Sequence, residues 1–355
     1  MQNMTHDQKP VKMERRRSRM FDRVLNKYAL WALIFVLAIG YVAISRAADV
    51  HTSEMTMKKD DSGEVITAEF SLQLNGYTTP YDVTSVFLMP GEKLNIDIVF
   101  PRAKQRYTFL ESASGKKAIF DEQIEWLAPA TPGFYQLEVF SKSHKVLVNA
   151  FVKIPAAEVD KGKIGFYRIG EYPSDKEIKN KTLYVVPDGY IEVTDQNRST
   201  KLSPSFTLGE FVSKQKSKYP KYVFLYERLL LKLELIKHEL NRKGVDAKKI
   251  IVMSGYRTPY YNKSIGNVKF SRHVFGDAAD IFIDNDGDYY MDDINGDGKR
   301  NYADAKKMAD IIENLSTRES YKPFVGGLGI YGSKPHRGPF VHVDTRGYSA
   351  RWSKP

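Results

Sequence analysis

The sequence contains no cysteine among its 355 residues. This absence excludes disulfide bonds, thiolate ligands for a metal and a cysteine nucleophile. The chain also has no segment in which basic and aromatic residues are clustered together, so we expect no nucleic-acid partner. One long uncharged apolar run stands out, close to the N-terminus.

Positive charge is spread unevenly along the chain. The formal net charge is +11, and the first 48 residues hold nine Lys and Arg against three Asp and Glu, whereas the remainder holds 45 against 40. The body of the protein is therefore only mildly basic, which suits a weak attraction to anionic cell-wall polymers. Hydrophobic residues make up 42% of the chain, enough for packed cores, and the length allows two or three domains.

The N-terminal part predicts export. Residues 1–27 are polar and basic and are expected to form a disordered cytoplasmic tail, and residues 28–45 are uncharged and mostly apolar. Because positive charge precedes the apolar run, we expect a single transmembrane signal anchor with its N-terminus in the cytoplasm. A cleaved signal peptide, with Ser45-Arg46-Ala47 as a poor cleavage site, is the alternative. Residues 46–64 are expected to be a linker.

Residues 65–155 carry the pattern of short β-strands. Apolar residues alternate with polar ones around Phe70–Leu74 and Leu94–Ile98, and Pro and Gly punctuate the segment. This pattern predicts an all-β, Ig-like sandwich. We expect it to serve as a spacer, with binding of glycan or of a protein partner as the alternative. Residues 156–200 are predicted to connect the domains through a hairpin in which 183–186 pairs with 190–193.

Residues 201–355 carry helix and strand signals of a third region. Thr207–Glu210 is a capping-box pattern that predicts a short helix. Apolar residues at helical spacing predict a long amphipathic helix over 220–243, which we expect to form a scaffold behind the functional site. Residues 250–253 predict a buried strand, and 302–315 a further helix.

Two histidines and one aspartate are candidate metal ligands. His273 and Asp280 lie in the pattern Ser-x-His-x-x-Gly-x-Ala-x-Asp, and His342 lies in the strand-like run Phe340–Asp344. Imidazole and carboxylate are good ligands for zinc, and three protein ligands leave a fourth position open, as in a catalytic site. Arg257 adds a fixed positive charge that can hold a carboxylate or an oxyanion. Each piece alone is weak, and only their joint order indicates a metal site.

The order Ser254–Arg257, Ser271–Asp280 and Phe340–Asp344 resembles the zinc D-Ala-D-Ala carboxypeptidase superfamily. That superfamily includes D-Ala-D-Ala dipeptidases, murein endopeptidases, phage endolysins and the hedgehog fold, and the likeness covers about residues 200–355. It implies an α+β domain with a small antiparallel sheet and helices. It also implies that His273, Asp280 and His342 bind zinc, and that Arg257 contacts the substrate.

The same resemblance implies the reaction. Water activated by zinc would hydrolyse a peptide bond next to a D-amino acid in peptidoglycan stem peptides, as a carboxypeptidase or an endopeptidase. The protein would then be anchored in a bacterial inner membrane with its catalytic domain in the periplasm.

The sequence departs from its relatives at the general base. Pro339 stands where several relatives carry Glu or Asp, three residues before the last ligand. Asp344 and His336 are the two candidates to take the proton, and the sequence does not choose between them. The missing carboxylate also leaves open a non-catalytic peptidoglycan-binding or scaffold protein.

A second metal signal lies in the insertion over residues 284–304. Its spacing fits the calcium loop of EF-hand and dockerin type, with Gly298 at the sharp turn, and predicts a structural calcium ion. The expected ligands are Asp293, Asn295, Asp297, Lys299 through its carbonyl, Asn301 and Asp304. A less regular site could form from Asp284, Asp286, Asp288 and Asp292. The loop and the β domain together support a third hypothesis, a calcium-dependent adhesion protein.

Overall fold

The computed structural model describes residues 70–99, 105–174, 177 and 183–355. The predicted cytoplasmic tail, transmembrane anchor and linker, at 1–27, 28–45 and 46–64, lie outside the described residues. Within those described ranges, no helix is long and apolar enough to cross a membrane.

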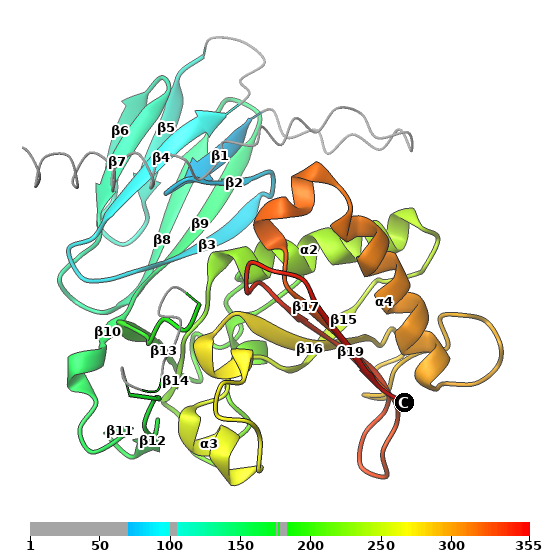
Figure 1. Ribbon diagram of the computed structural model, residues 1–355. Coiled ribbons are helices and arrows are strands. Elements are labelled where there is room, and N and C mark those ends of the chain that lie inside the picture. Colours follow the sequence, from blue (N-terminus) through cyan, green and yellow to red (C-terminus); the bar gives the residue numbers. More distant parts are fainter. Residues whose placement is uncertain (1–69, 100–104, 175–176, 178–182) are drawn as a thin grey trace, which may run out of the picture. The chain divides into compact units, whose positions relative to one another are not determined.

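Residues 70–152 form two β-sheets around one core (Figure 1). The first sheet has the order β2-β1-β4-β7 and the second β3-β9-β8-β5-β6, and only β3 and β9 pair in parallel. The strands of the first sheet are β1 (Ser71–Leu74), β2 (Tyr77–Thr79), β4 (Lys93–Val99) and β7 (Gln123–Leu127). Those of the second are β3 (Val83–Leu88), β5 (Tyr107–Glu111), β6 (Lys116–Phe120), β8 (Gly133–Phe140) and β9 (Lys145–Val152).

The alternation of apolar and polar residues along the strands explains why the two sheets share one core. Leu72 and Leu74 on β1 and Leu94 and Ile96 on β4 point inward, where they meet buried residues of the second sheet such as Phe109. Successive side chains of a strand point to opposite faces, so these positions bury one face of the sheet. The Ig-like class of this part stays a prediction.

The connecting region differs from the expected hairpin. Residues 183–186 form no strand, and β13 (Gly189–Val193) instead pairs with β10 (Ile154–Pro155) and β14 (Lys221–Val223). The hairpin prediction was wrong: Val185 and Val186 are 46% and 40% exposed and Tyr184 packs against Phe275 instead, whereas Ile191 and Val193 are buried. The short strands β11 (Lys163–Ile164) and β12 (Tyr167–Arg168) pair with each other, and η1 (Ala156–Glu158) is a 3₁₀ turn.

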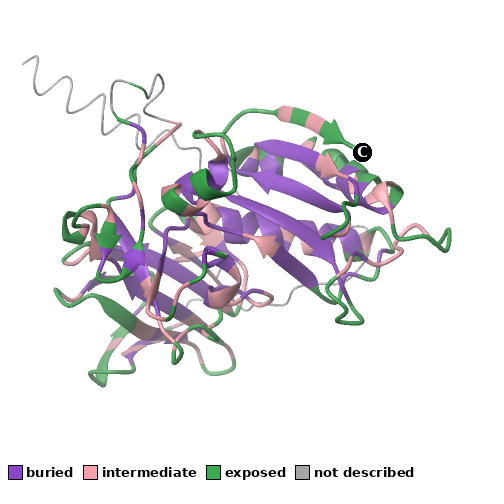
Figure 2. Ribbon diagram, turned by 90° about the horizontal axis from the view of Figure 1, so that it is seen from below, coloured by how far each residue is buried: buried purple, intermediate pink, exposed green. Residues whose placement is uncertain are grey.

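A five-stranded sheet organises the C-terminal region, in the order β15-β16-β18-β17-β19 (Figure 1). The first three pair antiparallel, as do β18 and β17, but β19 runs parallel to β17, so the sheet is mixed rather than antiparallel as expected. Its strands are β15 (Ile250–Ser254), β16 (Ala278–Ile283), β17 (Gly327–Tyr331), β18 (Phe340–Asp344) and β19 (Ala350–Lys354). Its central strands are buried, as the colouring in Figure 2 shows.

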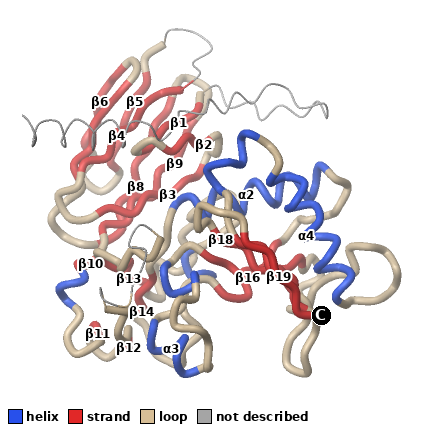
Figure 3. Tube along the Cα trace, in the orientation of Figure 1, coloured by secondary structure: helices blue, strands red, loops and turns tan. Residues whose placement is uncertain are grey.

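Helices accompany this sheet (Figure 3). Helix α4 (Tyr302–Ser316) contacts β17 and β18 and packs against α2 (Glu227–Arg242). The apolar stripe of α2 predicted from the sequence is buried, but the helix begins at Glu227, because the residues from Lys221 to Val223 form β14. The remaining helical segments are η2 (Leu208–Phe211), α3 (Pro259–Ser264), η3 (Arg272–Phe275) and η4 (Glu319–Phe324).

The capping box is confirmed at η2. The Glu210 carboxylate accepts hydrogen bonds from the Thr207 backbone N–H at 2.6 Å and from its hydroxyl at 2.9 Å. The short helix begins where the sequence predicts, because these bonds satisfy polar groups that the first turn leaves free.

A candidate metal centre

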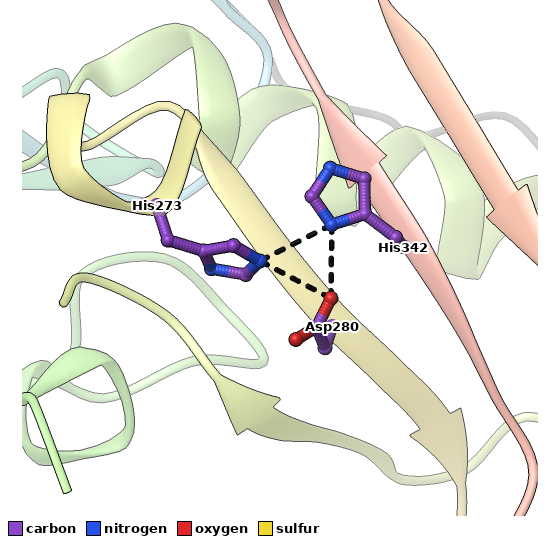
Figure 4. A group of neighbouring side chains, drawn as sticks. All are labelled: His273, Asp280 and His342. Carbon is purple, nitrogen blue, oxygen red and sulfur yellow. Dashed lines mark hydrogen bonds and ion pairs between the residues drawn. The ribbon is translucent and has the colours of Figure 1, made fainter. Parts of the chain in front are cut away.

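Three predicted ligands meet on one face of the sheet (Figure 4). Asp280 on β16 and His342 on β18 are direct partners in the antiparallel register, which places their side chains on the same face. Asp280 Oδ1 lies 2.9 Å from His342 Nδ1 and 3.2 Å from His273 Nε2, and the two nitrogens are 3.1 Å apart. All three side chains are buried.

A tight turn brings His273 to this group. η3 ends at Gly276, which has a φ of +72°. Glycine is needed there, because it adopts this left-handed conformation without strain and because a Cβ would lie 2.6 Å from the Phe224 carbonyl oxygen. Gly276 therefore shapes the turn between the two ligands His273 and Asp280.

The far nitrogens of both imidazoles have partners that set where the protons lie. His273 Nδ1–H donates to the Gly255 carbonyl at 2.7 Å, and His342 Nε2–H donates to Asp344 Oδ2 at 3.1 Å. The nitrogens that face each other then carry lone pairs. In that tautomer three acceptors converge, which is an arrangement that a bound cation stabilises.

The spacing of these atoms fits zinc. Ligands at about 2.0–2.1 Å from a tetrahedral zinc ion lie about 3.3 Å from one another. The three distances in the structure, 2.9, 3.1 and 3.2 Å, are close to this value. Two imidazoles and one carboxylate are also a donor set that zinc accepts readily.

The charge states of His273 and Asp280 agree with a metal-binding role. Burial lowers the pKa of His273, which favours the neutral ligand form. Burial alone would lower the pKa of His342, but its hydrogen bonds to Asp280 and Asp344 outweigh burial and raise that pKa. Burial would raise the pKa of Asp280, yet the neighbouring His273 and His342 hold it well below its usual range, so the carboxylate is ionised.

Arg257 is committed to the ligand Asp280. Its Nη2 donates to Asp280 Oδ2 at 2.5 Å and its Nε donates to Ser254 Oγ at 2.8 Å. The guanidinium therefore occupies one carboxylate oxygen and leaves Oδ1 to the two imidazoles. Arg257 also lines the cleft beside the site, and one of its five N–H donors serves the metal centre through Asp280.

The Asp344 carboxylate does not reach the open side of the site, where a general base would act. It is buried and contacts the far nitrogen of His342, while Oδ1 accepts from the Gly327 N–H at 2.8 Å and Oδ2 accepts from Arg346 Nη2 at 2.5 Å. Burial would raise its pKa, but His342 and Arg346 hold it well below the usual range. Asp344 thus positions His342 and does not face the cleft.

Sequence reasoning missed Arg346. It also missed the role of Gly326 and Gly327, which approach Asp344 so closely that a Cβ would lie 1.8 and 2.3 Å from atoms of that residue. An Arg two residues beyond an Asp is a weak sequence signal, because the same spacing occurs on any solvated strand.

A cleft of about 670 Å³ opens beside the candidate metal centre. Asp280, Arg257 and the exposed His336 line it, and Pro339 lies in its wall in place of the acidic residue of relatives. Of the two base candidates, the structure therefore brings His336 to the cleft and places Asp344 behind His342.

The calcium loop finds no support in the structure. The Asp304 carboxylate accepts from the Ile294 and Asn301 backbone N–H groups at 3.0 and 2.8 Å and caps helix α4, so its oxygens are already used. Asp293 likewise accepts from Gly296 and Gly298. The other residues that the sequence predicts as calcium ligands are Asn295, Asp297, Lys299 and Asn301. The acidic side chains that the structure does gather, with ligand atoms within 4.8 Å, are Asp284, Asp286 and Asp292.

Two buried imidazoles and a carboxylate beside an open cleft define the class of a single-metal hydrolytic centre. A family model described as Peptidase M15 matches residues 206–293, and the C-terminal region of the chain belongs to the M15 superfamily of zinc peptidases. The match includes Arg257, His273 and Asp280 and ends before His342. A search of curated proteins found no match. M15 peptidases are zinc-dependent, and the region is accordingly of metallopeptidase type.

Proposed function

We propose that the C-terminal region is a zinc peptidase that hydrolyses bonds next to D-amino acids in peptidoglycan stem peptides. The observation that carries the proposal is the convergence of His273 Nε2, His342 Nδ1 and Asp280 Oδ1, which lie within 3.2 Å of one another beside an open cleft. Membership of the M15 superfamily supports the same reaction class.

The residues of the chain have separable tasks in this mechanism. When bound, zinc polarises the scissile carbonyl and lowers the pKa of water. Arg257 balances the charge of Asp280, Asp344 holds the orientation of His342, and both keep the ligands rigid. The His336 imidazole accepts the proton of the attacking water and returns it to the leaving amine, since it lines the cleft and is exposed.

A non-catalytic peptidoglycan-binding protein is the second candidate. Pro339 replaces the acidic residue of relatives, and Asp280 is the one carboxylate among the residues that line the cleft. A centre that lacks an efficient base would bind the substrate without turning it over.

We also propose that the protein acts outside the cytoplasm. The apolar run over 28–45 would anchor it in a bacterial inner membrane, the β domain would be a spacer or would bind a partner protein, and the peptidase would face the periplasm. Stem peptides of the cell wall are the substrate available in that compartment.

Digestion of purified peptidoglycan tests the enzyme. Full-length protein supplied with zinc is compared with His273→Ala and with His144→Ala, which removes a histidine of the β domain. New muropeptides from the wild type and His144→Ala, but not from His273→Ala, are expected, and their masses identify the bond. If no protein releases fragments while the wild type binds zinc and sediments with the wall, the binding protein replaces the enzyme.

A further inference from the structure

Arg337 lies in the loop between β17 and β18, on the wall of the cleft that contains Asp280 and Arg257. Its sequence context predicts no role for it. It is five residues before the ligand His342, and Lys334 lines the same cleft.

Three contacts fix the guanidinium of Arg337. Its Nη1 donates to the carbonyl oxygens of Gly332 at 2.7 Å and Gly338 at 3.1 Å. Its plane also packs 4.6 Å from the ring centroid of Phe340. A guanidinium held in this way loses little conformational freedom when it binds a ligand.

The other edge of this guanidinium is free among the residues that the structure describes. Nε and Nη2 of Arg337 make no hydrogen bond there, and no carboxylate of that part of the chain lies within 4 Å of either Arg337 or Lys334. The Nε–Nη2 edge matches the two oxygens of a carboxylate and binds it through two parallel hydrogen bonds.

Stacked side chains connect Arg337 to the metal centre. Phe340 stacks on Tyr331 with ring centroids 4.5 Å apart, and the Tyr331 hydroxyl accepts from Trp352 Nε1 at 2.8 Å. The Trp352 ring lies 5.1 Å from that of His342. Packed side chains therefore hold the guanidinium of Arg337 at a defined position relative to the metal ligands.

The arginine expected to meet the substrate is partly engaged within the protein. Arg257 spends Nε on Ser254 and Nη2 on Asp280. Because Asp280 is the one carboxylate among the residues that line the cleft, Lys214, Lys334 and Arg337 give its walls a positive charge without acidic partners. A substrate with a free carboxylate complements that charge.

We propose that Arg337 is a specificity-determining residue that binds a free carboxylate of the substrate peptide through its Nε–Nη2 edge, with Lys334 adding charge. The inference rests on the proposed function only in taking a D-amino-acid peptide as the occupant of the cleft. It adds a residue of the β17–β18 loop to substrate recognition.

Binding of a matched pair of probes tests this role without turnover. The probes are the reduced-amide analogue of acetyl-D-Ala-D-Ala, which cannot be hydrolysed, and its C-terminal carboxamide. Their dissociation constants are measured by calorimetry on zinc-loaded full-length protein for the wild type, Arg337→Gln and Arg337→Lys. Arg106→Gln, which removes an exposed arginine of the β domain, is the control.

The wild type and Arg106→Gln are expected to prefer the acid about 10- to 100-fold, the range of a two-bond charged contact. Arg337→Gln should reduce the preference to near one and leave carboxamide binding within about threefold. The preference of Arg337→Lys for the acid should lie between these two values, because an ammonium keeps the positive charge but lacks the planar pair of N–H donors. Zinc content and melting temperature show that each variant is folded.

Two results would overturn the inference: an undiminished preference in Arg337→Gln, or no preference in the wild type. Its failure is separable from that of the proposed function. If the wild type prefers the acid but releases no fragment from peptidoglycan, the proposal of a carboxylate subsite stands and the proposal of peptidase activity fails.

Discussion

Asp344 Oδ2 lies 3.1 Å from Nε2 of His342, the ring nitrogen that points away from His273 and Asp280. The carboxylate therefore holds the imidazole from behind and fixes its proton there. Arg346 and the Gly327 N–H hold the carboxylate in turn. Such partners of a ligand affect metal affinity although they never touch the metal.

Replacement of Asp344 should weaken zinc binding. Asp344→Asn is expected to lower zinc affinity about 10- to 100-fold, because the neutral amide holds the His342 proton less strongly. Affinity is measured by competition with a chelator, and Asp121→Asn, an exposed residue of the β domain, is the control. Unchanged zinc affinity together with loss of the basic group from the pH–rate profile would restore Asp344 as the base.

His336 should affect turnover and not metal binding. His336→Gln is expected to lower kcat about 10²- to 10⁴-fold on muropeptides, the usual contribution of a positioned base. Zinc content should stay equal to that of the wild type, because His336 contacts none of the three ligands through a hydrogen bond in the structure. A variant with full activity would exclude His336 from proton transfer.

Loss of Arg257 should destabilise the metal-free fold. Arg257→Ala leaves the buried Asp280 carboxylate without its ion-pair partner. Breaking a buried pair in this way costs about 3–5 kcal/mol of unfolding free energy. The change is measured by urea unfolding in the presence of a chelator, with Arg106→Ala as the exposed control. A loss as small as that of the control would show that the pair contributes nothing.

Gly329 should be intolerant of a methyl group. A Cβ at this position would lie 2.4 Å from the Trp352 ring. We expect Gly329→Ala to cost about 1–3 kcal/mol of unfolding free energy through overpacking. The double variant Gly329→Ala/Trp352→Leu should recover part of the loss. If the single and double variants lose equal unfolding free energy, the strain does not come from the contact with Trp352.

Lys232 should make stability depend on pH. Burial lowers the pKa of this ammonium to about 7, although it donates to the carbonyl oxygens of Phe324 and Asp344. An unfolded lysine titrates at about 10.4, so between about pH 7 and 10.4 the unfolded chain binds more protons at this residue than the folded chain. Stability from Lys232 therefore rises with pH across this window.

Lys232→Met removes that dependence. The unfolding free energy of the wild type minus that of the variant should increase from pH 7 to pH 10, as measured by urea unfolding in matched buffers. A difference that stays flat across the same window would mean that the lysine titrates normally. Lys306→Met, which removes an exposed lysine of α4, is the control.

Local pattern was enough to predict several elements. The stripe of α2, the capping box of η2, the strand β15 and the helix α4 follow from side-chain periodicity and caps, which depend on residues close in sequence. The metal-ligand residues could also be predicted from the sequence, because His273 and Asp280 share one short motif whose turn needs Gly276.

Tertiary structure alone decided how those residues are used. Which nitrogen of His342 faces Asp280, and hence which side of the ring Asp344 occupies, depends on the pairing of β16 with β18, in which Asp280 and His342 are more than 60 positions apart. Whether Arg257 meets substrate or ligand depends on the pairing of β15 with β16, which places Ser254 opposite Asp280. The same holds for β13, which pairs with β10 and β14 instead of a neighbouring segment. Sequence determined the chemistry that is available, and long-range strand register determined which atoms meet, because register is set by burial over the whole sheet.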